Sequence, residues 1–281
     1  MLGRPVAERL VADGRTVRVL ARDPARAEKL LGRRFDYRQG DVSDPASLDA
    51  ALSGCAGAHV NLRGTTEADL HRVEVQGTEA VARAAKRAGV DRLTYLSGAG
   101  IESADPGLLP VRVKQTAEAA IRASGVPHTI LRATHFMESL DLFVRGETAT
   151  ILGDQPQRFH YLAAADYAAQ AARALTEPGA ADKALTLLGP QAHTMREALD
   201  VYVRLSRPDL KVAQAPLPLV RLVATLKGDR QLKLVTDLFR AFRRIPETGD
   251  RAEADRLLGP ATTTLEEWCR ARAIPHEAWA R

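Results

Sequence analysis

The chain is short of cysteine, of aromatic residues and of long apolar runs. Its 281 residues include only two cysteines, Cys55 and Cys269, and neither lies in a CxxC or a Cys/His pattern. This spacing argues against a disulfide framework and a zinc site, so we expect no bound metal. No apolar run approaches the roughly 20 residues of a membrane span, and the N-terminus lacks the basic-then-apolar order of a signal peptide. We therefore expect a cytoplasmic protein without a membrane partner.

Charge of a single sign is not concentrated anywhere. The formal net charge is +5, and the charged residues, 27% of the total, are spread along the chain. We expect no nucleic-acid partner, because dispersed arginines are usually solvated helix faces. At this length the chain can bury the core of one large domain or two modest ones.

Strands alternate with helices through the first half of the chain. Strands are expected at 16–21, 35–38, 58–62, 93–96 and 129–131. Helices are expected at 2–14, 24–31 and 67–88, and Asp23-Pro24 and Asp44-Pro45 have the order of an N-cap and a first helical residue. This alternation indicates βαβ units and a parallel sheet.

The C-terminal half is predicted to be mostly helical. Asp166 is expected to cap a helix over 167–175, and 195–206 and the basic, amphipathic stretch 219–244 are also predicted to be helical. Thr264, with Glu267 three residues later, predicts a capping box at the start of a last helix.

One stretch, 91–139, places polar residues after two neighbouring strands. The first strand ends at Ser97, the following helix carries Lys114 near its start, and the second strand leads into Arg132. Parallel strands joined by a helix place their carboxyl ends at one edge of the sheet, where ligands bind. We therefore expect Ser97, Lys114 and the segment 132–137 to face one cleft.

Three motifs in this stretch carry a family resemblance. They are YLSG at 95–98, K-x-x-x-E at 114–118 and SGVPHTILR at 124–132. Together they resemble the atypical short-chain dehydrogenase/reductase group, close to the NmrA-like NAD(P)-binding proteins. The resemblance implies an α/β fold, a Rossmann-like doubly wound parallel sheet over 1–135, with a smaller, mostly helical substrate region over 136–281.

The resemblance also marks a missing part. Members of the family open with an apolar strand and a G-x-x-G-x-x-G turn, whereas here only Gly3 corresponds to the last of these glycines. The strand would be central in the order 3-2-1-4-5-6, and the turn would hold the cofactor pyrophosphate at a helix N-terminus. We expect impaired cofactor affinity in the chain as written, and a misassigned start or a truncation explains the pattern better than an evolved variant.

Cofactor contacts are implied at two strand ends. Arg22 follows the second strand of the family pattern, where arginine accommodates the 2′-phosphate of NADP, and Arg26 lies one turn further on. NADP is therefore favoured over NAD, although both arginines also fit an exposed helix start. The pair Asp41-Val42 resembles the adenine-binding Asp-apolar pair of the family, with turn formation after Gly40 as the alternative.

The resemblance implies catalytic roles for Ser97 and Lys114. Ser97 would orient a substrate carbonyl, but the tyrosine that usually lies four residues before the lysine is replaced by Pro110. A lysine-based variant remains, in which burial lowers the pKa of Lys114, with binding of the nicotinamide ribose alone as the alternative. Glu74 also departs from the family, which has asparagine there.

The segment after the last strand is implied to form a substrate wall. His135, Phe136 and Met137 occupy it, and packing is the alternative for His135. The resulting hypothesis is an NADPH-dependent reductase of small carbonyl or quinone-like compounds. A dinucleotide-sensing regulator with a protein partner is the alternative. A sugar-nucleotide epimerase ranks last because it needs the absent tyrosine.

Overall fold

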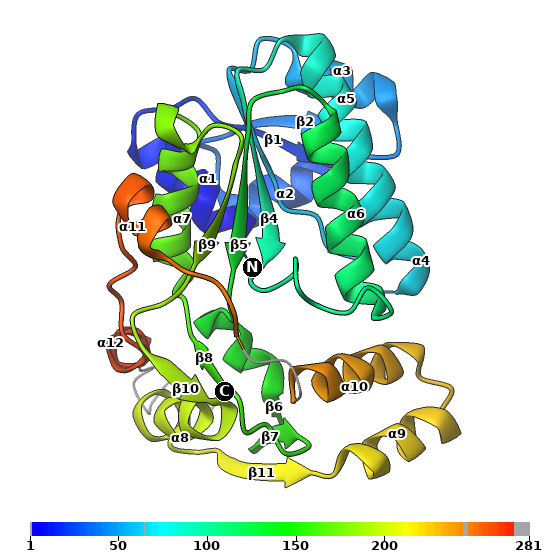
Figure 1. The fold of residues 1–281 in the computed structure, drawn as a ribbon, viewed down its shortest axis with the longest axis vertical. Helices are drawn as coiled ribbons and strands as arrows, with labels where there is room; N and C mark the ends of the chain where they lie inside the picture. The colour runs from blue at the N-terminus through cyan, green and yellow to red at the C-terminus, as the bar shows by residue number, and fades with distance from the viewer. Residues whose placement is uncertain (1, 65, 244–246, 273–281) are drawn as a thin grey trace. The chain divides into compact units, whose positions relative to one another are not determined.

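The computed structural model describes residues 2–64, 66–243 and 247–272 and divides into two compact units (Figure 1). Unit 1 comprises Met1–Ala133, Tyr167–Thr186 and Asp250–Gly259, and unit 2 comprises Thr134–Asp166, Leu187–Gly249 and Pro260–Arg281. The first continuous stretch of unit 1 thus ends near the division expected at residue 135. The chain then returns to this unit twice, because further elements complete its sheet and its helical cover.

Unit 1 has the alternating order that the sequence predicts. Its strands are β1 (Arg18–Ala21), β2 (Asp36–Gln39), β3 (Gly57–Val60), β4 (Arg92–Gly98), β5 (His128–Ala133) and β9 (Lys183–Leu187). Its helices are α1 (Gly3–Ala12), α2 (Pro24–Leu31), α3 (Pro45–Leu52), α4 (Glu67–Asp69), α5 (Gly77–Ala88), α6 (Leu109–Ala123), α7 (Ala164–Ala174) and α11 (Ala252–Leu258). Unit 1 is therefore the expected Rossmann-like α/β unit.

Local signals begin and end these helices where expected. The carboxylates of Asp23 and Asp44 accept from the backbone N–H groups of Arg26 and Ala46 at 3.0 and 3.1 Å. Gly125, just after α6, adopts a φ of +68°, which glycine tolerates best. The capping prediction for this part of the chain is confirmed.

The parallel sheet of unit 1 is interrupted between β1 and β3. One block contains β1 and β2, and the other has the order β3-β4-β5-β9. β1 is only half-buried at all its positions, whereas β4 is buried at every position except the last. Among the described residues no strand pairs with the outer edges of β1 and β3, where the family resemblance implies a further strand.

An engineered extension that provides one apolar strand before Gly3 is expected to stabilise unit 1. A strand joined to β1 through α1 would lie parallel beside it by the right-handed crossover rule. Each backbone group that it pairs would remove a cost of about 1–3 kcal/mol if that group is buried. Urea unfolding of the extended protein measures the gain. A glycine/serine extension of equal length is the control, and equal midpoints for the two would contradict the prediction.

The long helix expected at 67–88 contains a segment of a different kind. Residues Leu70–Gln76 form a π-helix between α4 and α5. Its i→i+5 hydrogen bonds change which side chains face inward, and such segments are frequent at functional sites. The sequence pattern predicted one continuous α-helix here and did not predict the π-helical segment.

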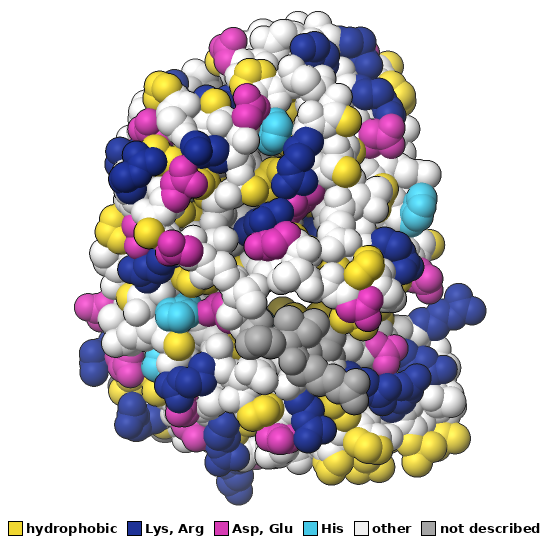
Figure 2. All heavy atoms as spheres, viewed as in Figure 1, with side chains coloured by type: hydrophobic (Ala, Val, Ile, Leu, Met, Phe, Trp, Pro, Cys, Tyr) yellow, Lys and Arg dark blue, Asp and Glu magenta, His cyan; other side chains and the backbone are white. Residues whose placement is uncertain are grey.

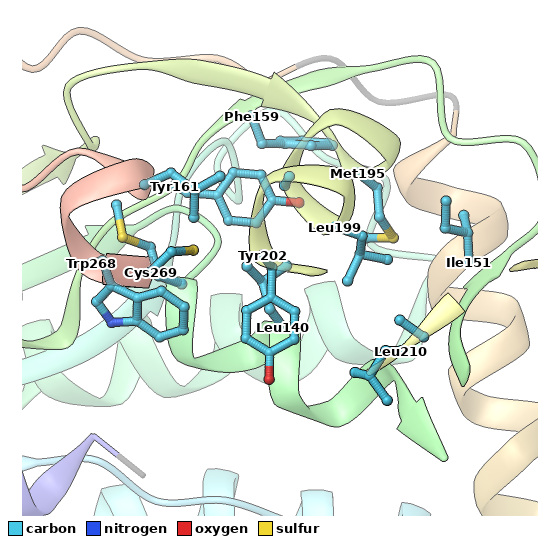
Figure 3. Packing of buried hydrophobic residues seen from close by; sticks show 14 of the residues in the cluster. Leu140, Ile151, Phe159, Tyr161, Met195, Leu199, Tyr202, Leu210, Trp268 and Cys269 are labelled. Carbon is cyan, nitrogen blue, oxygen red and sulfur yellow. The ribbon is translucent and has the colours of Figure 1, made fainter. Parts of the chain in front are cut away.

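Unit 2 combines small sheets with helices. Its elements are the 3₁₀-helix Met137–Phe143, the strands β6 (Val144–Arg145), β7 (Thr148–Leu152), β8 (Arg158–His160), β10 (Ala192–Thr194) and β11 (Lys211–Ala215), and the helices α8 (Met195–Ser206), α9 (Leu217–Leu226), α10 (Arg230–Phe242) and α12 (Leu265–Ala271). Figure 3 shows the core of this unit, in which the rings of Tyr161, Tyr202 and Trp268 lie among aliphatic side chains. Unit 2 therefore has a core of its own, with more strand than the sequence predicted.

Two expectations about helix starts in this half have different outcomes. The capping box of Thr264 and Glu267 is confirmed. The expectation that Asp166 caps a helix is wrong, since α7 already begins at Ala164. The Asp166 carboxylate instead accepts from the backbone N–H groups of Thr262 and Thr263, because the later segment of unit 2 passes beside it.

The surface carries charges of both signs. Figure 2 shows basic and acidic side chains interspersed over the face in view, without a broad field of one sign. In the described part of the chain, no helix has the length and apolar character to cross a bilayer. Over the same residues, no cluster of three or more histidine, cysteine or acidic side chains has a metal-binding arrangement.

Candidate active site

Ser97 lies at the carboxyl end of β4, where its side chain turns toward α6. The hydroxyl donates to Oε1 of Glu118 at 2.6 Å. Arg132, at the end of β5, binds the same carboxylate through Nε at 3.1 Å and Nη2 at 2.8 Å. Arg122 adds a fourth contact at 2.9 Å. The Glu118 side chain is only 3% exposed, so it ties together the ends of two strands and one helix.

This network restricts what Ser97 can donate. A serine hydroxyl has one proton, and the Ser97 proton is directed at Glu118. Burial alone would raise the pKa of Glu118, but the hydrogen bonds from Arg132 and Ser97 outweigh it and lower that pKa. Glu118 therefore remains an anion that holds the hydroxyl, and a role for Ser97 in orienting a carbonyl stays a prediction.

Lys114 lies on α6, one helical turn before Glu118. Its ammonium donates to the carbonyl of Leu96 at 3.3 Å and pairs with Oε2 of Glu74 at 3.0 Å. It also lies 5.3 Å from the centroid of the Tyr95 ring. The Lys114 side chain is 25% exposed, so solvent reaches the ammonium even though Glu74 holds it in place.

The expected lowering of the Lys114 pKa is wrong. Burial does oppose the charged form of this lysine, as predicted. However, the interactions with Tyr95 and Glu74 outweigh burial and raise the pKa of Lys114 above its usual value. Burial also raises the pKa of Tyr95, so at neutral pH the phenol is neutral and the ammonium is charged. Lys114 is therefore a fixed cation in this arrangement.

Ser97 and Lys114 lie on the same side of β4. The Ser97 hydroxyl binds a residue of α6, and the Lys114 side chain reaches from α6 to the backbone of β4. Both side chains thus lie between the end of this strand and the helix that covers it. The two side chains therefore lie at the carboxyl end of the same strand, and the expectation that they face one cleft with the segment 132–137 stays a prediction.

Arg22 and Asp41, two of the cofactor residues predicted after β1 and β2, lie near one another. Ser43 donates to Oδ1 of Asp41 from its N–H at 2.9 Å and its hydroxyl at 2.7 Å. These bonds lower the pKa of Asp41, and the positive charge of Arg22 adds to the effect. Val42 packs against Gly77, where a Cβ atom would come within 2.7 Å of it. The Asp41 contacts are those of a turn, and its adenine role stays a prediction.

Of the expected phosphate-binding parts, the described residues provide two arginines and the start of α1. Arg22 and Arg26 are exposed, and Arg22 is close enough to Asp41 for its positive charge to lower the pKa of that carboxyl. α1 begins at Gly3 without a side-chain cap, so its first N–H groups are not used by a capping side chain. A Cβ atom at Gly3 would meet nothing within 4 Å, so the packing itself does not require glycine there.

His135, Phe136 and Met137 belong to unit 2 and pack within it. The His135 ring lies 4.3 Å from the ring of Phe159 and 4.8 Å from that of Phe242, and burial lowers the pKa of His135 to about 4. Phe136 and Met137 are 9% and 1% exposed. These contacts favour packing roles, and a substrate role for the three residues stays a prediction.

Sequence reasoning missed the two partners of Lys114, Glu74 and Tyr95. Glu74 was noticed only as a departure from the family, yet it binds Lys114. The Tyr95 ring lies 5.3 Å from the ammonium, a contact that the sequence did not predict. The available signal was an acidic residue, Glu74, within the predicted helix 67–88, because such a residue usually requires a cationic partner once it is buried.

Comparisons with known proteins agree with the motifs. The profile of an NAD(P)H-binding family matches residues 1–178. A (4-alkanoyl-5-oxo-2,5-dihydrofuran-3-yl)methyl phosphate reductase of Streptomyces griseus is 36% identical over 70% of this chain and 67% of its own. Quinone oxidoreductase 2 of Escherichia coli is 27% identical over 95% of this chain and 93% of its own.

A solved structure supports the fold. The triphenylmethane reductase of Citrobacter sp., complexed with NADP(H), matches with a TM-score of 0.76 and 21% identity over 98% of this chain and 97% of its own. At this identity the likeness shows the fold alone.

The predicted class, an NAD(P)H-dependent oxidoreductase, agrees with the names of the sequence relatives. On the match over residues 1–178, the chain belongs to this NAD(P)H-binding family.

Proposed function

We propose that this protein is an NADPH-dependent reductase of small quinone-like or conjugated carbonyl compounds. The observation that carries the proposal is a charged lysine, Lys114, held at the carboxyl edge of a parallel sheet. Ligands of open α/β sheets bind at this edge. The Streptomyces griseus relative is named as a reductase of an unsaturated lactone and the Escherichia coli relative as a quinone oxidoreductase, which agrees with this substrate class.

The chemistry follows from what the chain provides. When bound, NADPH supplies a hydride, and the acceptor oxygen then carries negative charge. The Lys114 ammonium would stabilise that charge, since a preoriented cation acts strongly where water is partly excluded. Because its pKa is raised, its contribution is that of a fixed charge more than of a proton donor.

The missing tyrosine narrows the substrate class. A simple ketone becomes a strongly basic alkoxide and needs an acid at the moment of reduction. A quinone becomes a phenolate-type anion, which is far less basic and can take its proton from water. With Pro110 four residues before Lys114, the chain lacks the usual acid at that position, and quinone-like acceptors fit it better.

Turnover is the direct test. NADPH oxidation is followed by absorbance with a naphthoquinone and with an aliphatic ketone of similar size, and we expect turnover with the quinone. NADPH binding without oxidation of any acceptor in a wider panel would contradict the reductase and favour the dinucleotide sensor. An epimerase remains the least suited alternative, because it depends on the absent tyrosine.

Preference for NADPH is expected to depend on Arg22. The change Arg22→Ser should raise the Kd for NADPH by roughly tenfold or more, since a charge-assisted hydrogen bond contributes about 1.5–3 kcal/mol. The Kd for NADH should change little, because NADH has no 2′-phosphate. Fluorescence titration with both cofactors measures the ratio.

The matched control for this prediction is Arg15→Ser, which removes an exposed arginine before β1. It should leave both affinities unchanged. Equal weakening of NADPH and NADH binding by Arg22→Ser would show that Arg22 does not read the 2′-phosphate.

A further inference from the structure

We propose that Glu74 is a positioning residue for Lys114, which orients the ammonium at the end of β4 and sets the pH range over which Lys114 acts. The proposal rests on the proposed reductase function and adds a residue to its machinery. In this arrangement a carboxylate–lysine pair takes the place of the tyrosine–lysine pair that the sequence lacks.

Both oxygens of the Glu74 carboxylate are engaged. Oε2 pairs with Lys114 at 3.0 Å, and Oε1 accepts from the backbone N–H of Gly64 at 2.8 Å. The Glu74 side chain is 8% exposed, so water competes little for it. A carboxylate bound through both oxygens cannot rotate away. It therefore fixes the position of the Lys114 ammonium.

The backbone around Glu74 is tightly packed. A Cβ atom at Gly64 would lie 2.5 Å from the backbone nitrogen of Leu70, so glycine alone lets this loop approach the helix. Glu74 itself lies in the π-helix Leu70–Gln76, whose widened turn gives its residues a register that an α-helix would not. The local departure from regular structure thus coincides with the residue that binds Lys114.

The groups around Lys114 come from three elements. Glu74 faces it from the π-helix and Tyr95 from β4, together with the carbonyl of Leu96. Glu118, one turn further along α6, affects Tyr95 by its charge. Of the two acidic residues only Glu74 pairs directly with the ammonium, since Glu118 is bound by Ser97 and two arginines. Glu74 is therefore the residue whose removal changes the charge facing Lys114 most.

A purely stabilising role for the pair is the competing explanation. Buried ion pairs are poor sources of net stability, because desolvation offsets the attraction between the charges. A purely stabilising pair would also shift the Lys114 titration when it is broken, because pKa and stability are linked, but it would leave kcat of the folded variant near the wild-type value. The titration therefore tests whether Glu74 controls the charge of Lys114, and kcat of the charge-conserving variant Glu74→Asp separates positioning from stability.

The test compares Glu74→Gln with the wild-type protein. Lysines are labelled by reductive methylation with ¹³C-formaldehyde, and the Lys114 signal is assigned by its loss in Lys114→Arg. We expect the Lys114 titration midpoint to fall by about one pH unit or more in Glu74→Gln, as loss of a nearby opposite charge implies. In turnover, the alkaline limb of the kcat/KM profile should move to lower pH by a similar amount.

Two further variants complete the test. Glu79→Gln removes an exposed glutamate of α5 that pairs with Arg83, and it should change neither profile. Glu74→Asp keeps the charge but shortens the side chain, so it should retain the midpoint and lower kcat. If Glu74→Gln fails to fold, Glu74→Asp still tests the proposal through its kcat.

The outcomes are distinguishable. An unchanged Lys114 midpoint in Glu74→Gln, or wild-type kcat and midpoint in Glu74→Asp, would overturn the positioning role. The magnetic resonance titration requires neither cofactor nor substrate. Absence of all reductase activity would therefore count against the proposed function, while the titration would still decide whether Glu74 controls Lys114.

Discussion

Replacing Lys114 with methionine is expected to lower kcat for quinone reduction by roughly 10²–10³-fold, the usual loss when one preoriented electrostatic group is removed. Lys114 is the cation whose ammonium is held by Glu74 and by the carbonyl of Leu96 at the end of β4. Methionine preserves most of the side-chain volume but removes the charge. Steady-state rates of NADPH oxidation at saturating quinone measure the effect.

The controls for this change separate catalysis from folding. Lys114→Met leaves the Glu74 carboxylate buried without its partner, so some stability is lost as well. The double variant Lys114→Met/Glu74→Gln removes that unpaired charge and should regain stability without regaining rate. Lys211→Met changes an exposed lysine of β11 and should behave as wild type. Near wild-type kcat in folded Lys114→Met would limit Lys114 to a binding role.

Replacing Glu118 with alanine is expected to lower the free energy of unfolding by about 3–5 kcal/mol, as when one partner of a buried ion pair is removed. Glu118 is 3% exposed and binds Arg132, Arg122 and the hydroxyl of Ser97. Its loss leaves the Arg132 guanidinium, only 13% exposed, without its bidentate partner. Urea unfolding at neutral pH measures the change.

The matched control for this prediction uses the other acidic partner of Arg132. Glu102 pairs with the same guanidinium at 3.1 Å but is 42% exposed. Glu102→Ala should therefore cost no more than about 1 kcal/mol, as exposed ion pairs do. Similar losses for the two alanine variants would show that burial does not decide the strength of this network.

The pH dependence of the Glu118 contribution has a definite sign. Its folded-state pKa lies below the usual value, so the carboxylate stabilises the fold fully above the unfolded pKa of about 4.3. That stabilisation is lost as the pH falls through the folded-state pKa. Glu118→Gln cannot titrate, so the stability difference between it and wild type should shrink in acid. A difference independent of pH would contradict the assigned ionisation.

Much of the fold follows from local features of the sequence. Asp23 and Asp44 cap helices because their short side chains reach N–H groups two or three residues away. Gly125 ends α6 because its backbone adopts a positive φ. These interactions depend on neighbours in the chain, so the βαβ alternation of unit 1 was predictable. The strands of unit 2 are short and depend on distant partners, and most were not predicted.

The sequence by itself determined the family, the parallel sheet and the presence of Ser97 and Lys114 at its carboxyl edge, since motif spacing and strand order are properties of the chain. Only the tertiary structure decided what these residues touch. It directs the Ser97 proton to Glu118 and pairs Lys114 with Glu74. It also reverses the expected direction of the Lys114 pKa shift. The reason is physical: charge interactions depend on the distances between groups and on their burial, which packing sets between elements far apart in the sequence.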